Sequence, residues 1–111
     1  MKKKYIIKNN KDFKRLIKSG KKYSNFFSTI YVSTNKLNYS RFGISIPRKI
    51  NIAVKRNKFK RIIKSIISKN INFFNNIDCV IIVNNTIFEM DYYEIKKELI
   101  FLLKKIKNKE I

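Results

Sequence analysis

The sequence predicts one small α/β domain whose elements run helix, strands, helix, strand, helix. Its 111 residues suit a single hydrophobic core. Alternating apolar and other side chains over 41–47 indicate a strand, and an apolar stripe over 59–67 indicates a long helix. No internal repeat or linker divides the chain. Residues 1–111 are therefore taken as one domain, which begins with a basic arm at residues 1–9.

The first half of the chain predicts one helix and two clear strands. Asn10 is expected to cap a helix that ends near Gly20, with Asp12 in its first turn, where the helix dipole favours an acid. A strand is expected over 26–32. Strict alternation along it places three residues on one face: Phe27, Thr29 and Tyr31. The next strand, 41–47, ends at Pro47, which cannot donate to a sheet.

The second half predicts two amphipathic helices around a buried strand. Asn51 suits the N-cap of a helix with one apolar stripe, formed by Phe59, Ile62, Ile63, Ile66 and Ile67. The segment 78–83 is apolar on both faces after Asp78 and rich in β-branched residues, which is typical of a central strand. Asp91 and Glu94 have the spacing of a capping box. The closing helix then has a buried stripe of Ile95, Leu99, Leu102, Leu103 and Ile106.

Charge is the strongest indication of function. Lys and Arg total 27 against 7 Asp and Glu, which gives a net charge of +20 and a pI near 10.3. A domain this basic attracts polyanions, above all nucleic acid. A peripheral membrane helix is less well supported, because the apolar stripes are needed for the core. No helix-turn-helix spacing favours a sequence-specific DNA reader.

Composition also excludes several kinds of catalytic and metal site. The chain has no His, so no His-based acid–base pair, triad or metal site is possible. Cys79 is the one cysteine, which excludes an internal disulfide and a cysteine cluster for zinc. The apolar run around 79–83 is far too short to span a membrane. With no signal-peptide core after the basic start, we expect a cytoplasmic protein.

A row of basic residues, which we call the basic rail, follows the strand at 41–47. Only five arginines occur among many lysines, and four of them fall within residues 41–61. Arg offers a planar fork of donors that Lys lacks. No acid lies between Asp12 and Asp78, whereas a merely solvated face would mix signs. We therefore predict an RNA-binding surface from the turn and the polar helix face, formed by Arg48, Lys49, Arg56, Asn57, Lys58, Lys60, Arg61 and Lys64.

This stretch resembles the protein subunit of bacterial ribonuclease P. The family has an Arg-Asn-Arg core within a run like A-V-x-R-N-x-x-K-R, and residues 53–61 read AVKRNKFKR. Lys58 stands where the family has its second Arg. The preceding family pattern, R-x-G-x-S-x-x-K-K, appears in residues 41–49 as RFGISIPRK. The resemblance covers roughly residues 5–105.

The resemblance implies an αβββαβα order like domain 2 of ribosomal protein S5, with a left-handed β-α-β crossover. Such a crossover departs from the usual handedness of parallel connections. The residue patterns alone give two strands before the long helix. A third strand would need either the weak segment 21–25 or a split near 41–47.

The resemblance also implies a non-catalytic protein with two RNA partners. One is the ribonuclease P RNA, bound one protein per RNA; the other is precursor tRNA, whose 5′ leader that RNA removes using Mg²⁺. The protein itself would bind no cofactor or metal, contain no catalytic residue and need no membrane. The alternative is a small, basic, ribosome-associated structural protein.

The family has a cleft between its first helix and its sheet that holds the single-stranded leader. The matching positions are Phe13, Ile17, Thr29 and Tyr31, and strand alternation adds Phe27. Aromatic rings on one strand face suit base stacking. Ile17 stands where relatives often have an aromatic residue. The alternative for Phe13 and Tyr31 is an ordinary place in the core.

Overall fold

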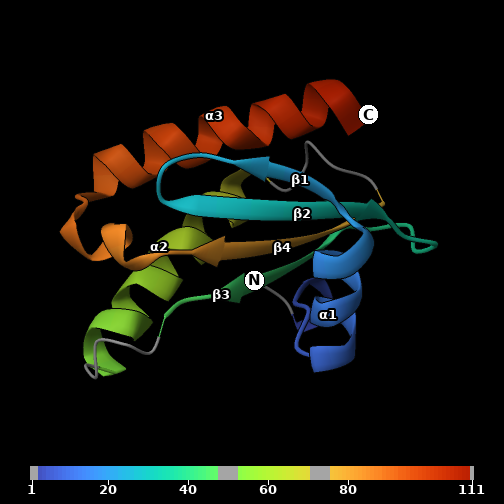
Figure 1. Ribbon diagram of the computed structural model, residues 1–111, viewed down its shortest axis with the longest axis horizontal. Coiled ribbons are helices and arrows are strands. Elements are labelled where there is room, and N and C mark those ends of the chain that lie inside the picture. Colours follow the sequence, from blue (N-terminus) through green and yellow to red (C-terminus); the bar gives the residue numbers. More distant parts are fainter. Residues whose placement is uncertain (1–2, 48–52, 71–75, 111) are drawn as a thin grey trace.

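The computed structural model describes residues 3–47, 53–70 and 76–110. Within them a four-stranded sheet carries three α-helices (Figure 1). In chain order the elements are η1 (Lys3–Tyr5), α1 (Asn10–Ser19), β1 (Lys21–Ser24), β2 (Ser28–Thr34), β3 (Arg41–Ser45), α2 (Ala53–Asn70), β4 (Ile77–Val83), η3 (Asn85–Glu89) and α3 (Tyr92–Glu110). The predicted α/β class and αβββαβα order are confirmed, and β1 is the third strand.

The sheet has the strand order β1-β2-β4-β3. β2 is antiparallel to both β1 and β4, whereas β3 runs parallel to β4. β4 therefore has a hydrogen-bonded strand on each side, and all but one of its side chains are buried. The prediction of a central strand in this segment is confirmed, because apolar residues on both faces require cover on both faces.

The connection from β3 through α2 to β4 is left-handed. In Figure 1 both strands point left, β4 lies above β3, and α2 passes behind the sheet. Parallel strands joined in this way are right-handed in about 98% of cases. The expected departure from the rule is confirmed, and it places α2 beside the outer strand β3, next to the chain segment that precedes α1.

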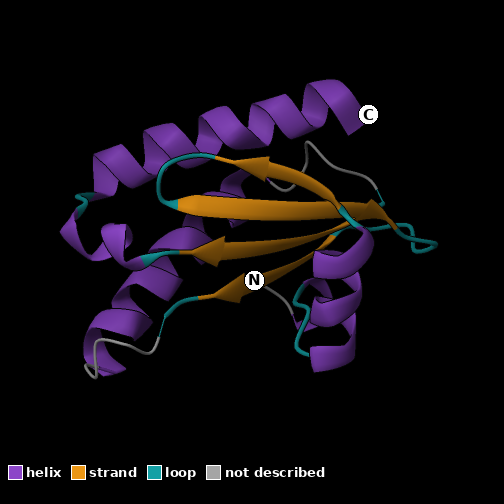
Figure 2. Ribbon diagram, in the orientation of Figure 1, coloured by secondary structure: helices purple, strands orange, loops and turns teal. Residues whose placement is uncertain are grey.

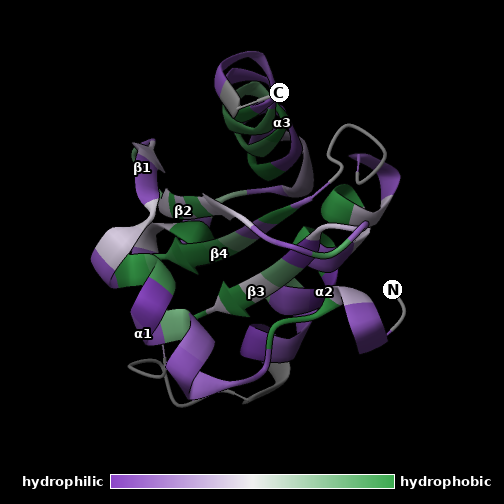
Figure 3. Ribbon diagram, turned by 90° about the vertical axis from the view of Figure 1, so that its right-hand side faces the viewer, coloured by the Kyte–Doolittle hydropathy of each residue, from purple (hydrophilic) through white to green (hydrophobic). Residues whose placement is uncertain are grey.

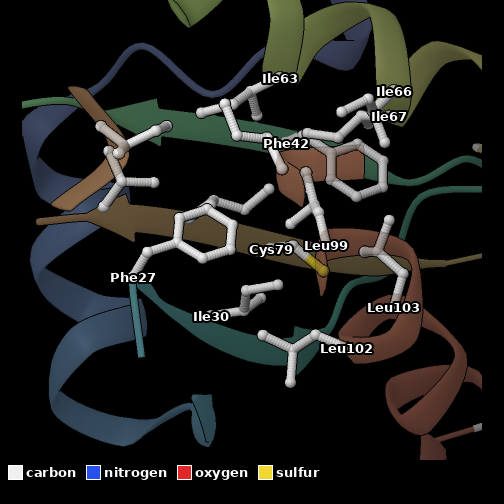
Figure 4. Close-up of a cluster of buried hydrophobic side chains, with 14 of the residues drawn as sticks. Phe27, Ile30, Phe42, Ile63, Ile66, Ile67, Cys79, Leu99, Leu102 and Leu103 are labelled. Carbon is white, nitrogen blue, oxygen red and sulfur yellow. The ribbon is translucent and has the colours of Figure 1, made fainter. Parts of the chain in front are cut away.

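Helices cover the two faces of the sheet unequally. α2 and α3 lie over one face (Figure 2), where the main core includes Phe27, Ile30, Phe42, Ile63 and Leu99 (Figure 4). α1 covers the other face, where Leu16 packs with Ile7 and Val80 in a smaller cluster. Apolar residues of α3 face the sheet in Figure 3. The α1 face is thus the thinly covered side of the molecule.

The predicted helical stripes agree with the structure. In α2 the residue Ile62 is half-buried and the other four members of its stripe are buried, and all five members in α3 are buried. The capping box forms: the Glu94 backbone N–H donates to Asp91 Oδ1 over 2.9 Å, and the Asp91 N–H donates to Glu94 Oε1 over 3.3 Å. The expected cap at Asn51 lies outside the described residues.

Two local predictions are wrong. The N-cap of α1 is Asn9 instead of Asn10, since the Asn9 side chain accepts from the Lys11 backbone N–H. The second error concerns Phe27, which does not share a face with Thr29 and Tyr31. Asn25 Oδ1 accepts from the backbone N–H groups of Phe27 and Ser28, so the chain bends there and β2 begins only at Ser28. Phe27 is fully buried in the α2–α3 core and cannot line a cleft on the opposite face.

Candidate nucleic-acid interface

A groove of about 580 Å³ lies between the N-terminal segment, α1, β3 and α2. Its apolar floor includes Phe13, Phe42, Ile44 and Ile46. Five cations line it, and they come from three parts of the chain: Lys8, Lys14, Arg56, Lys60 and Lys64. The groove therefore combines an apolar floor with positively charged walls, which suits a ligand that has both flat bases and phosphates.

Backbone pairing holds the N-terminal wall of the groove in place. Ile6 forms a parallel bridge with Phe42, and the Ile7 backbone N–H donates to the Phe42 carbonyl over 2.8 Å. Ile7 is buried and anchors this segment, and the next residue, Lys8, lines the groove. On the facing wall, α2 buries its apolar stripe and leaves polar residues toward the groove. The N-terminal segment and α2, which are far apart in the sequence, thus form facing walls of the groove.

The electrostatics of the groove are one-sided. No acid is among its lining residues in the described part of the chain. Burial lowers the pKa of Lys60, and the nearby charges of Lys64, Arg56 and Lys8 lower it further. The Nε atom of Arg56 is buried and has no hydrogen-bond partner. An anion in the groove would relieve the repulsion among the cations and satisfy that donor.

The structure divides the predicted basic rail. Four of its members line the groove: Arg56, Asn57, Lys60 and Lys64. Lys58 and Arg61 are exposed on α2 but are not among the groove-lining residues, and the Lys58 Nζ lies 5.9 Å from the Phe59 ring centroid. Arg48 and Lys49 lie outside the described residues. Lys8 and Lys14 are groove cations that the sequence patterns did not single out.

Two of the residues predicted to line the leader cleft, Phe13 and Thr29, lie on the α1 side of the sheet. Phe13 lines the groove and lies against Gly43, where an added Cβ would be 2.6 Å from the Phe13 Cζ. Strand register places Thr29 opposite Ile82, and Ile82 opposite Ser45, which also lines the groove. We call this set, Thr29, Ile82 and Ser45, the sheet row. None of its members is buried, so it offers a shallow continuation of the groove.

The remaining cleft residues border the sheet row. Tyr31 is half-buried and packs with the small cluster under α1, so it is partly core and partly accessible. Ile17 is 43% exposed on α1. Neither residue is among those that line the groove. Four of the five predicted cleft residues therefore lie on the α1 side of the sheet, and Phe27 does not.

The sequence analysis missed one constellation, centred on Asp78. This carboxylate is 1% exposed. It accepts from Arg41 Nε and Nη2 over 2.9 and 2.7 Å, and from Arg15 Nη2 over 3.2 Å. It also accepts from Asn35 Nδ2 over 2.8 Å. Burial opposes ionisation of Asp78, but these hydrogen bonds outweigh it and hold its pKa below the usual value.

Comparison with known proteins identifies the family. A sequence model of the family Ribonuclease P matches residues 1–107. The chain belongs to the ribonuclease P protein family. The ribonuclease P protein component of Mycoplasma mycoides is 40% identical over 109 residues, which cover 96% of this chain and 100% of the relative. That of Clostridium botulinum is 38% identical, covering 89% and 91%.

Solved structures agree with this family assignment. The Staphylococcus aureus ribonuclease P protein superposes with a TM-score of 0.87 at 33% identity, covering 93% of this chain and 95% of that one. The Thermotoga maritima ribonuclease P protein gives a TM-score of 0.81 at 30% identity, covering 90% and 96%. The resemblance inferred from residues 41–61 is confirmed, and so is the function class, a protein component of ribonuclease P. None of the described helices has the length and apolar character to cross a membrane.

Proposed function

We propose that the groove and the exposed cations of α2 bind the ribonuclease P RNA, and that the sheet row guides the 5′ leader of precursor tRNA toward the groove. The observation that carries the proposal is the cation-lined groove itself. Its five positive side chains face no acid among the lining residues, and it contains the unpartnered Nε of Arg56.

Phosphate groups fit the walls of this groove. A guanidinium binds phosphate with two parallel hydrogen bonds, so Arg56 contributes geometry as well as charge. Asn57 can both donate and accept, which suits a sugar hydroxyl or a base edge. Lys58 and Arg61 lie on the exposed surface of the same helix and extend the contact beyond the groove. Arg48 and Lys49 precede α2 and belong to the same proposed surface.

Unpaired bases fit the floor of the groove and the sheet row. The accessible faces of Phe13 and Tyr31 can stack on bases, at about 1–3 kcal/mol per base. Thr29 can hydrogen-bond, and Ile17 packs without stacking. Mature tRNA has no leader and would make none of these contacts, so the protein would favour substrate over product.

In this proposal the RNA subunit carries the chemistry and the protein assists it. The catalytic RNA and precursor tRNA repel each other, and Mg²⁺ or a cationic protein can screen that repulsion. A chain of charge +20 that contacts both RNAs would lower the Mg²⁺ concentration required. One protein per RNA suffices for this role. Mg²⁺ would be bound by the RNA, and the complex would act in the cytoplasm.

The first test compares cations on one helix. We expect Arg56→Ala and Lys60→Ala to weaken binding of the RNA subunit and each to reduce the salt slope by about one. Lys69→Ala is the matched control, because Lys69 is exposed near the far end of α2. Equal effects of all three variants would mean that charge acts diffusely, and would refute the groove as the binding site.

The second test is cleavage of one precursor tRNA by the RNA alone, the protein alone and both together, at low and high Mg²⁺. We expect no cleavage by the protein alone and the largest stimulation at low Mg²⁺. Cleavage by the protein alone would refute the proposed division of labour. A stimulation independent of leader length would refute the role of the sheet row.

A further inference from the structure

Two arginines outside the groove share one buried carboxylate. Arg15 and Arg41 both bind Asp78, and they join three elements: α1, β3 and β4. Asp12 lies beside both, 3.6 Å from the Arg15 guanidinium and 3.8 Å from that of Arg41. The cluster holds two carboxylates and two guanidinium groups, so its formal charge is zero in a chain of +20. It is therefore a poor phosphate site and calls for another explanation.

The position of Asp78 on the sheet suggests that explanation. On β4, Asp78 lies at the end where α1 covers the sheet, the right-hand end in Figure 1. Ile82, in the sheet row, lies four residues farther along the same strand. Strand geometry separates these two positions by about 13 Å on the same face. The bond from Arg15 to Asp78 therefore ties α1 down at the end of the sheet that is remote from the sheet row.

Apart from the ion pair of Asp12 with Arg41, whose atoms lie 3.8 Å apart, the side-chain contacts of α1 with the sheet are mainly apolar. Leu16 packs into a small apolar cluster, and the Phe13 ring lies against Gly43. Neither contact is directional. The bond from Arg15 to the buried carboxylate is directional, because a charge-assisted hydrogen bond fixes both distance and angle. It joins α1 to a carboxylate that Arg41 and Asn35 already hold in place.

We propose that Asp78 and Arg15 are positioning residues for leader recognition. Their bond holds α1 over one end of the sheet and keeps the sheet row open for the leader. Binding of the RNA subunit should depend on it less, because four of the five groove cations lie outside α1 and the Asp78 cluster makes no contact with α2 among the contacts described. This inference rests on the proposed function of the sheet row.

Arg15→Ala tests the inference directly. It removes the tie to α1 but leaves Asp78 bonded to Arg41 and Asn35, so the buried carboxylate stays partnered. Lys18→Ala is the matched control, since it removes one positive charge from an exposed position on the same helix. The measurements are the affinity for the RNA subunit and the ratio of affinities for precursor and mature tRNA in the reconstituted complex.

We expect Arg15→Ala to reduce the precursor preference at least about fivefold, as for one lost stacked base. Its affinity for the RNA subunit should fall by a smaller factor than the precursor preference, because α1 supplies only Lys14 among the five groove cations. Arg15→Lys should restore part of the preference. If both variants alter the preference equally, the positioning role is refuted. If Arg15→Ala lowers the affinity for the RNA subunit and the precursor preference by the same factor, Arg15 is merely structural and the inference also fails.

A second measurement does not depend on RNA. Because the Phe13 ring lies against Gly43, its ring current is expected to shift the NMR resonances of Gly43. We expect Arg15→Ala to move those resonances toward their unstructured values in the free protein, and Lys18→Ala to leave them unchanged. Unchanged Gly43 resonances in Arg15→Ala would refute the inference. A moved resonance together with no precursor preference in the unmodified protein would instead refute the proposed function of the sheet row.

Discussion

Replacing Gly43 with alanine provides a test of how tightly α1 is seated on the sheet. The added Cβ would lie 2.6 Å from the Cζ and 2.8 Å from the Cε2 of Phe13, and 3.3 Å from the Cβ of Ile7. The two distances to Phe13 are shorter than carbon atoms tolerate, so the Phe13 ring must move. Overpacking of this kind costs about 1–3 kcal/mol, which lowers the Tm by roughly 4–15 °C in a domain of this size.

The assay is a double-mutant cycle measured by thermal or urea unfolding. Leucine at position 13 is shorter than phenylalanine and leaves room for the new methyl group. Phe13→Leu should therefore reduce the cost of Gly43→Ala, with a coupling free energy of about 0.5 kcal/mol or more. Strict additivity of the two changes, or an unchanged stability for Gly43→Ala, would refute the inferred contact. Because Phe13 also lines the groove, Gly43→Ala should weaken leader binding as well.

Three further predictions follow from the site and the Asp78 cluster. Five groove cations imply that log affinity for the RNA subunit falls with log salt concentration with a slope of about −4 or steeper. The affinity should therefore fall a hundredfold or more between ~50 and ~200 mM salt. An affinity that does not change with salt would contradict this. Because the pKa of Asp78 is lowered in the folded state, its ionised form stabilises the protein above the unfolded-state pKa near ~4, and that contribution is lost as the pH falls through the lowered value. Asp78→Asn should therefore cost about 3 kcal/mol near neutral pH and flatten the acid end of the stability profile, as measured by urea unfolding across pH. Tyr31→Ala should narrow the preference for precursor over mature tRNA and leave the affinity for mature tRNA nearly unchanged.

The elements with a regular side-chain period could be predicted from the sequence. The stripes of α2 and α3, the apolar run of β4 and the capping box of α3 depend on neighbours a few residues apart. Because the spacing of residues near in sequence determines these elements, the sequence pattern alone predicts them. The same holds for the family motif in residues 41–61, whose contiguous residues are enough to indicate the family.

Features that depend on contacts between distant segments could not be predicted in this way. β1 has the sequence KKYS, with neither alternation nor apolar character, and is a strand because β2 pairs with it. Strand alternation alone predicts the wrong face for Phe27, because hydrogen bonds to the Asn25 side chain set where the strand begins. A strand face is defined only once its register is fixed, and that register comes from pairing.

The sequence by itself determined the charge, the absence of histidine chemistry, the two long helices and the family. Only the tertiary structure decided which cations share a groove, because Lys8 joins Arg56 and Lys60 through the pairing of the N-terminal segment with β3. It alone also joined Arg15, Arg41 and Asp78, which lie up to 63 residues apart in the chain. Composition and periodicity are properties of neighbouring residues, whereas electrostatic and hydrogen-bonding partners depend on distances in space that only the folded chain sets.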